Sequence, residues 1–121
     1  MLRQFDQDAA EKRMGQILEL ITPHMDEINQ LISAHHSIVI NIPEDVHPLH
    51  PDELREAREE PFAFRRAILS DALFRIAIAE QQTGVTYPDQ DIPEKVISDI
   101  NAKIAEMAAI ERGARSGRLT H

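Results

Sequence analysis

The sequence predicts a mainly α-helical protein, a small bundle of about four helices packed around a buried central helix over residues 62–82. Three observations predict it. Residues 62–82, FAFRRAILSDALFRIAIAEQQ, contain no Gly or Pro and are apolar on most of a helical circumference. Residues 14–35 and 97–107 carry apolar side chains at alternating spacings of three and four, which is the period of one helix face. A run of β-branched residues typical of a strand occurs once, at 38–40.

The first periodic segment begins near Asp8 and forms a heptad seam, a stripe in which the a and d positions are apolar. We call this stripe the first seam. It is long enough to pair with another helix, either in the same chain or in a second copy, and it is the predicted interface of a homodimer. The residues of the predicted interface are Met14, Leu18, Ile21, Met25, Ile28 and Ile32, and the same spacing continues to His35.

Pro23 interrupts this segment, because a proline inside a helix removes a backbone hydrogen bond and crowds the preceding turn. One interpretation is a single kinked helix. The other is a break, in which Thr22 caps a second helix, Pro23 takes its first position, and Asp26 and Glu27 lie near its positive end. Pro23, Asp26 and Glu27 are residues typical of the start of a helix, so they favour the break.

Residues 37–42 form the one short β-strand that the sequence predicts, since Ile38, Val39 and Ile40 follow one another directly. A strand cannot satisfy its backbone groups alone, so it needs a partner. Residues 85–87, which follow the Gly84 that ends the central helix, and the same strand of a second copy are the two candidates.

The remaining segments complete a single helical domain over residues 1–112. Residues 44–61 hold three of the seven prolines and one short helical stretch that follows Pro51. The last helix is predicted from about Pro93 to Arg112, with Gly113 as its terminator. Residues 113–121 are predicted to be a flexible basic tail.

Composition favours the cytoplasm. The chain has no cysteine, so disulfides and thiolate metal sites are excluded, and its charged N-terminus lacks the apolar run of a secretion signal. The longest uncharged stretch, residues 28–43, contains polar side chains that include Asn29, Gln30, Ser33, His35 and His36, and it does not fit a membrane span.

Charge argues against direct binding of nucleic acid. The formal net charge is -8, and three arginines lie in the last ten residues. An acidic body disfavours contact with phosphates. The same charge leaves open an acidic inhibitor that mimics nucleic acid and occupies a binding site on another protein.

Histidines supply the one candidate metal site. His47 and His50 are close in sequence and have four acidic neighbours, and imidazole with carboxylate can hold zinc or another divalent cation. A metal-binding regulator or metalloenzyme is therefore an alternative function. The other interpretation is that both are exposed loop residues, because prolines constrain this segment and no helical turn aims the two rings at one point.

Catalytic signatures do not appear elsewhere. The four glycines are scattered, so they cannot form a phosphate-binding loop, and no serine lies in a nucleophile-elbow context. The sequence therefore predicts a non-catalytic interaction or assembly protein without a cofactor, which binds itself and an unidentified protein partner. Its small size and lack of cysteine suit an accessory factor of a bacterium or phage.

Overall fold

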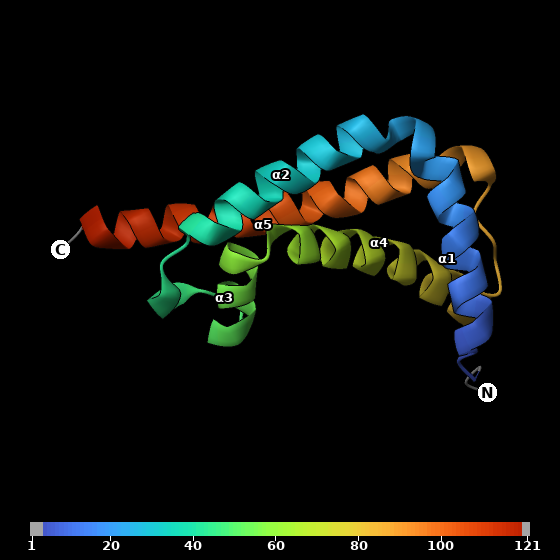
Figure 1. Ribbon diagram of the computed structural model, residues 1–121, viewed down its shortest axis with the longest axis horizontal. Coiled ribbons are helices and arrows are strands. Elements are labelled where there is room, and N and C mark those ends of the chain that lie inside the picture. The colour runs from blue at the N-terminus through green and yellow to red at the C-terminus, as the bar shows by residue number, and fades with distance from the viewer. Residues whose placement is uncertain (1–3, 120–121) are drawn as a thin grey trace.

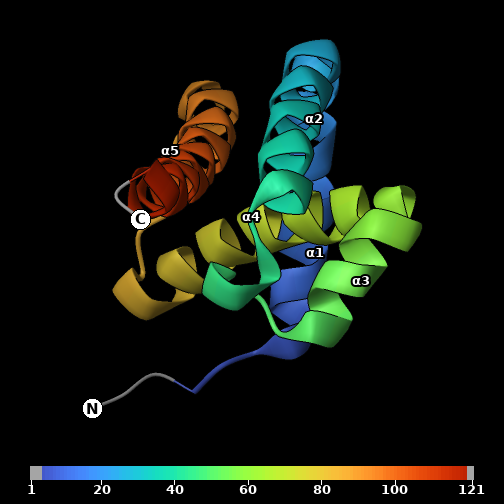
Figure 2. The ribbon, with the colours of Figure 1, turned by 90° about the vertical axis from the view of Figure 1, so that its left-hand side faces the viewer.

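The structure, a computed structural model, describes the backbone of residues 4–119 and the side chains as far as residue 115. This part of the chain forms helices α1 (Gln7–Ile21), α2 (Met25–Asn41), α3 (Pro51–Glu59), α4 (Pro61–Thr83) and α5 (Ile92–Leu119). Helices α2 and α5 lie side by side and run in the same direction, and α4 crosses beneath them (Figures 1 and 2). The predicted helical bundle is confirmed. Among the described helices, none has a stretch long and apolar enough to cross a lipid bilayer.

Helix α4 contains the predicted central segment, and it contacts α1, α2, α3 and α5. Its two halves differ, however. The C-terminal half supplies the buried residues of the helix, which are Ala72, Leu73, Ile76, Ala77 and Glu80. The N-terminal half, Pro61–Asp71, has no fully buried residue, and Phe62 is 74 % exposed. Only half of the helix is therefore surrounded by the bundle.

The main core lies between α1, α2, the C-terminal half of α4 and the first turns of α5. It is built mostly from isoleucine, whose branched side chain fills space at low entropic cost. Its buried members are Ile17, Ile21, Ile28, Ile32, Ala72, Leu73, Ile76, Ile92, Val96 and Ile100. The C-terminal part of the first seam therefore packs inside the chain, against α4 and α5.

The segment around Pro23 is a break between two helices. A short 3₁₀ turn, Thr22–His24, separates α1 from α2, and the chain changes direction there (Figure 1). The Thr22 side chain does not cap α2, because its hydroxyl donates to the Leu18 carbonyl oxygen at 2.8 Å. The interpretation as a break is confirmed, whereas the capping role of Thr22 is wrong.

The strand predicted over residues 37–42 is wrong, because these residues form the end of α2 and the residue that follows it. Val39 and Ile42 are fully buried, and Val39 packs with Leu54 and Ala57 of α3 in a second core cluster. A β-branched residue costs only about 0.5 kcal/mol in a helix, which burial of its side chain outweighs. Residues 85–87, the proposed strand partner, belong to the loop after α4.

That loop begins at Gly84, which ends α4 in the left-handed conformation with φ of 74°. Glycine adopts this conformation without a steric penalty, and its N–H donates to the Glu80 carbonyl oxygen at 2.8 Å. The sequence signal for the end of the central helix is therefore correct.

The helix end predicted at Gly113 is wrong, since α5 continues to Leu119 and projects past the ends of α2 and α3 (Figure 1). A Cβ atom at Gly113 would meet nothing within 4 Å, so the position is open. Arg115 pairs with Glu111 one turn earlier at 2.6 Å and supports the helix across the glycine. The division at residue 113 into a domain and a flexible tail stays a prediction. Residues 120–121 and the side chains after 115 lie outside the described part.

Candidate functional site

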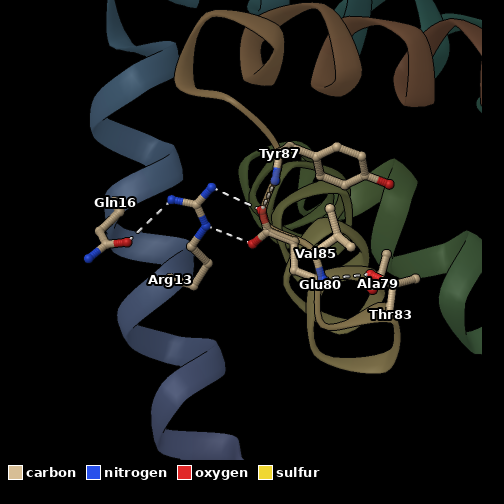
Figure 3. A network of polar contacts seen from close by, with 7 residues as sticks. All are labelled: Arg13, Gln16, Ala79, Glu80, Thr83, Val85 and Tyr87. Carbon is tan, nitrogen blue, oxygen red and sulfur yellow. Dashed lines mark hydrogen bonds and ion pairs between the residues drawn. The ribbon is translucent and has the colours of Figure 1, made fainter.

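The C-terminal end of α4 is fixed by a buried ion pair with α1 (Figure 3). Arg13 Nε and Nη2 donate to the two carboxylate oxygens of Glu80 at 2.7 and 3.0 Å. The hydrogen bond to Glu80 raises the pKa of Arg13. Glu80 Oε2 also accepts from the Tyr87 backbone N–H at 2.9 Å. One buried carboxylate thus holds α1, α4 and the following loop together.

A second pair of contacts closes the same end. The Asp6 N–H donates to Gln81 Oε1 at 3.0 Å, and Gln81 Nε2 donates to the Asp6 carbonyl oxygen at 2.9 Å. Thr83 donates its hydroxyl to the Ala79 carbonyl oxygen and accepts the Val85 N–H (Figure 3). These polar groups are satisfied within the chain, so this end has a structural role.

The opposite end of α4 contains two hollows on either side of Phe64. The first, which we call the inner cavity, has a volume of about 300 Å³ and lies between α2, α4 and α5. The second, the outer groove, has a volume of about 210 Å³ and lies between α3 and α4. The Phe64 ring stacks on the ring of His35 with a centroid separation of 5.7 Å and an interplanar angle of 14°.

The inner cavity has an apolar wall and a charged wall. The apolar wall joins the second core cluster to the edge of the main core, and it consists of Val39, Leu49, Phe64, Ile68, Ala102 and Met107. The charged wall consists of His35, Arg75, Asp99, Lys103 and Glu106. This combination is typical of small-molecule sites, where polar groups orient a ligand that is held mainly by apolar contact.

Asp71 pairs with both cations beside the cavity. Lys103 donates to Asp71 Oδ2, and Arg75 Nε donates to the same oxygen at 2.9 Å. Burial by itself raises the pKa of Asp71, but the hydrogen bonds and positive charges of Lys103 and Arg75 outweigh burial and lower it. Asp99 lies 3.7 Å from Lys103, which is too far for a hydrogen bond.

Two polar atoms of the cavity lining have no hydrogen-bond partner, namely His35 Nδ1 and Asp99 Oδ2. In the part of the chain that the structure describes, no other buried side-chain nitrogen or oxygen lacks a hydrogen-bond partner. His35 is only 2 % exposed. Its burial, together with the positive charge of Lys103, lowers its pKa to about 4, so the ring is neutral at physiological pH.

The outer groove has a floor of small side chains and an acidic rim. Ala57, Ala63 and Ala67 leave space beside Phe64, while Glu53 and Glu56 line the side formed by α3. Both glutamates are exposed, and neither forms an ion pair with a side chain of the described region. The groove therefore presents uncompensated negative charge next to an apolar surface.

The predicted metal ligands His47 and His50 have other partners. His47 Nδ1 accepts the Leu49 N–H at 3.1 Å, which leaves Nε2 to donate to the Val39 carbonyl oxygen at 2.8 Å. His50 Nδ1 accepts the Asp52 N–H at 3.2 Å and so caps α3. Within residues 4–119, no group of three or more potential ligands is arranged to hold a metal ion. A metal at this pair would have to displace a backbone contact of His47.

The six residues of the predicted interface lie in different environments. Ile21, Ile28 and Ile32 are fully buried in the main core, and Met14 and Met25 are half-buried. Leu18 is 41 % exposed. A homodimer that used the whole first seam would therefore have to displace α4 and α5.

Sequence reasoning missed the polar cluster around the inner cavity, although local signals for it exist. Asp71 with Arg75 and Asp99 with Lys103 are pairs of opposite charge four residues apart, on two helices that were both predicted. His35 is the last position of the first seam. Only the packing of α2, α4 and α5 shows that Arg75, Asp99 and Lys103 of these pairs line one cavity with His35.

The chain matches no family model, no curated protein and no solved structure. Functional inference therefore depends on the geometry described above.

Proposed function

We propose that the protein is a non-catalytic interaction protein that assembles with copies of itself, with the C-terminal part of α5 from one copy bound in the outer groove of another. The observation that carries the proposal is a complementarity of charge at one end of the molecule. The C-terminal part of α5 projects at the same end of the molecule as α3 (Figure 1) and carries Arg112 and Arg115, of which Arg115 pairs with Glu111. The α3 side of the outer groove carries the unpaired carboxylates of Glu53 and Glu56.

The projecting part of α5 has the character of a groove-binding helix. Arg112 and Arg115 are exposed, and Ile110 and Ala114 add half-buried apolar surface on the same stretch. Arg118 contributes a further positive charge in the sequence. An amphipathic helix of this kind binds a groove through its apolar side, while opposite charges on the rim set its orientation.

A second copy suits this role better than the chain's own terminus. Helix α5 is continuous through Leu119 and points away from the body, so it cannot return to its own groove without breaking (Figure 1). The groove and the α5 end lie at the same end of the molecule. Two copies that meet there can therefore exchange these contacts reciprocally, which gives a closed dimer with twofold symmetry.

Charge reversal with complementation tests the proposal. The first variant combines Glu53→Lys with Glu56→Lys, and the second combines Arg112→Glu with Arg115→Glu. We expect each variant alone to be monomeric in native mass spectrometry, because like charges face each other in both reciprocal contacts. An equimolar mixture should form a heterodimer, since the groove of the first variant then meets an acidic α5 end in the second.

A control variant with Glu11→Lys and Glu19→Lys makes the same change in net charge as the first variant, but on the exposed face of α1. It should keep the assembly state of the parent protein. A parent that is monomeric at every concentration would refute the proposal, as would a dimer that survives both reversals. A dimer lost on Leu18→Asp, but not on charge reversal, would indicate assembly through the first seam instead.

A further inference from the structure

The inner cavity contains a mismatch that the proposed assembly does not explain. A buried polar atom without a partner has lost its water and gained nothing in return, which is why such atoms are rare in folded proteins. Here His35 Nδ1 and Asp99 Oδ2 both lack a hydrogen-bond partner, although Asp99 Oδ2 lies 3.7 Å from Lys103 Nζ in an ion pair. The two residues come from different helices, and both line the inner cavity. Two independent observations therefore indicate that the cavity holds a polar group.

The volume of the cavity indicates more than a bridging water. About 300 Å³ is available. A single water needs only about 15 Å³ of such space and two to four polar partners. The wall formed by Phe64, Ile68 and Met107 offers water no hydrogen bond. An apolar body on the ligand would fill this side.

The chemistry of the two unpartnered atoms defines the head group. An ionised carboxylate only accepts hydrogen bonds, so Asp99 needs an N–H or O–H donor. A neutral imidazole offers one donor and one acceptor, so His35 Nδ1 can meet either kind of group. A head that carries N–H groups satisfies Asp99 and remains compatible with His35.

Charge excludes an anionic head group. Arg75 and Lys103 are already paired with Asp71, while Asp99 and Glu106 add negative charge to the lining. A carboxylate or phosphate would therefore face Asp99 without a free cation to pair with it. The carboxylates of Asp99 and Glu106 would repel such a group.

We propose that the inner cavity binds a small molecule with an apolar body and a neutral or positively charged head that carries N–H donors, such as an amine or a primary amide. This assignment does not rest on the proposed assembly, because neither His35 nor Asp99 lines the outer groove.

Three probes that share a phenyl ring test the assignment on the full chain, namely benzylamine, benzamide and benzoate. Binding is followed by NMR of the histidine ring signals and by titration calorimetry. We expect benzylamine and benzamide to bind at millimolar concentration or below and to shift the His35 signal. Benzoate should bind at least about tenfold more weakly than benzylamine, because it offers Asp99 no donor.

Variants of Asp99 test the head group. Asp99→Ala should weaken benzylamine about tenfold, the usual effect of losing one charged hydrogen-bond partner. Asp99→Asn keeps an acceptor oxygen but removes the charge, so it should weaken benzylamine more than benzamide. This difference between two probes in one variant does not arise from a general loss of folding.

Variants of α5 test the location. Ala102 lines both the inner cavity and a neighbouring hollow between α4 and α5, so Ala102→Leu should abolish binding of both probes. Ser98, one turn earlier, lines this neighbouring hollow but not the inner cavity, so Ser98→Leu should leave binding unchanged. Equal binding of benzoate and benzylamine, or binding that resists Ala102→Leu, would overturn the assignment. Absence of binding by all three probes would overturn it too and would leave water as the occupant.

Discussion

The two halves of α4 have similar composition but opposite environments. In the C-terminal half, Leu73 and Ile76 are in the main core, and the buried Glu80 has its carboxylate fully paired. In the N-terminal half, Phe62 is exposed and Phe64 separates two hollows. The C-terminal half also borders a hollow of about 310 Å³ between α4 and α5. The two halves therefore differ in the burial of their side chains and in the pairing of their polar groups, not in the presence of unfilled space.

The polar groups that are paired within the chain contribute to its stability, and those that lack a hydrogen-bond partner are the candidates for binding. Where polar groups are satisfied inside the chain, as in the Arg13–Glu80 pair, they fix the arrangement of the helices. Where they are left without partners, as in His35 and Asp99, they are available to another molecule. Substitutions in the two halves should accordingly affect different measurements.

The largest difference is expected between Leu73→Asp and Phe62→Asp. Leu73 is 5 % exposed, so an aspartate there buries an unpaired charge, and the free energy of unfolding should fall by more than about 4 kcal/mol. Phe62→Asp places the same charge at an exposed position and should change the free energy of unfolding by less than about 0.5 kcal/mol. Urea denaturation followed by circular dichroism measures both. Similar losses in the two variants would mean that the halves do not differ in this way.

The Arg13–Glu80 pair should give the next largest effect. Arg13→Met leaves the Glu80 carboxylate buried without its cation, which should cost about 3 kcal/mol. The double variant Arg13→Met with Glu80→Met removes both charges, and its loss should be clearly smaller than that of the single variant. A double variant as unstable as Arg13→Met would show that the cost is one of packing and not of an unpaired charge.

His35 should make stability depend on pH. Its pKa in the folded chain is about 4, compared with 6.5 when unfolded. Above pH 6.5 both states are neutral. As the pH falls below 6.5, the unfolded chain binds a proton that the folded chain does not, so stability is lost down to about pH 4. The positive charges of Lys103 and His36 add to the effect of burial, and the carboxylates of Asp99 and Glu106 line the same cavity as His35.

The loss between pH 7 and pH 5 should reach about 2 kcal/mol, measured from urea denaturation at each pH. His35→Phe should remove most of this dependence, because it replaces the buried imidazole with an apolar ring. His24→Gln changes an exposed histidine and should leave the dependence in place. A parent protein with constant stability over this range would contradict the assignment to His35.

The sequence predicted the helices where a local pattern determines them. The apolar circumference of residues 62–82, the break at Pro23 and the end of α4 at Gly84 all depend on neighbours within a few turns. The strand at 37–42 was wrong because Val39 packs against Leu54 and Ala57 of α3, a contact that local propensity does not include. The inner cavity could not be predicted, since its lining joins residues that are far apart in sequence.

The smallest expected change in the free energy of unfolding concerns Gly84 and Gly113, both of which the sequence predicted to end a helix. Gly84 has φ of 74°, so Gly84→Ala forces a Cβ into the left-handed region and should destabilise the chain by about 1 kcal/mol. At Gly113 the helix continues and a Cβ meets nothing within 4 Å. Gly113→Ala should therefore stabilise the helix, by up to about 1 kcal/mol.

Whether Gly113→Ala stabilises or destabilises the chain decides between two descriptions of α5. If Gly113 ended the helix as Gly84 does, alanine would destabilise both positions, and the residues that follow would not form a regular helix. Helical content from circular dichroism and the melting temperature measure the two variants side by side. Opposite signs would mean that α5 extends as a helix beyond the body, which is what the outer groove of a second copy requires in order to bind it.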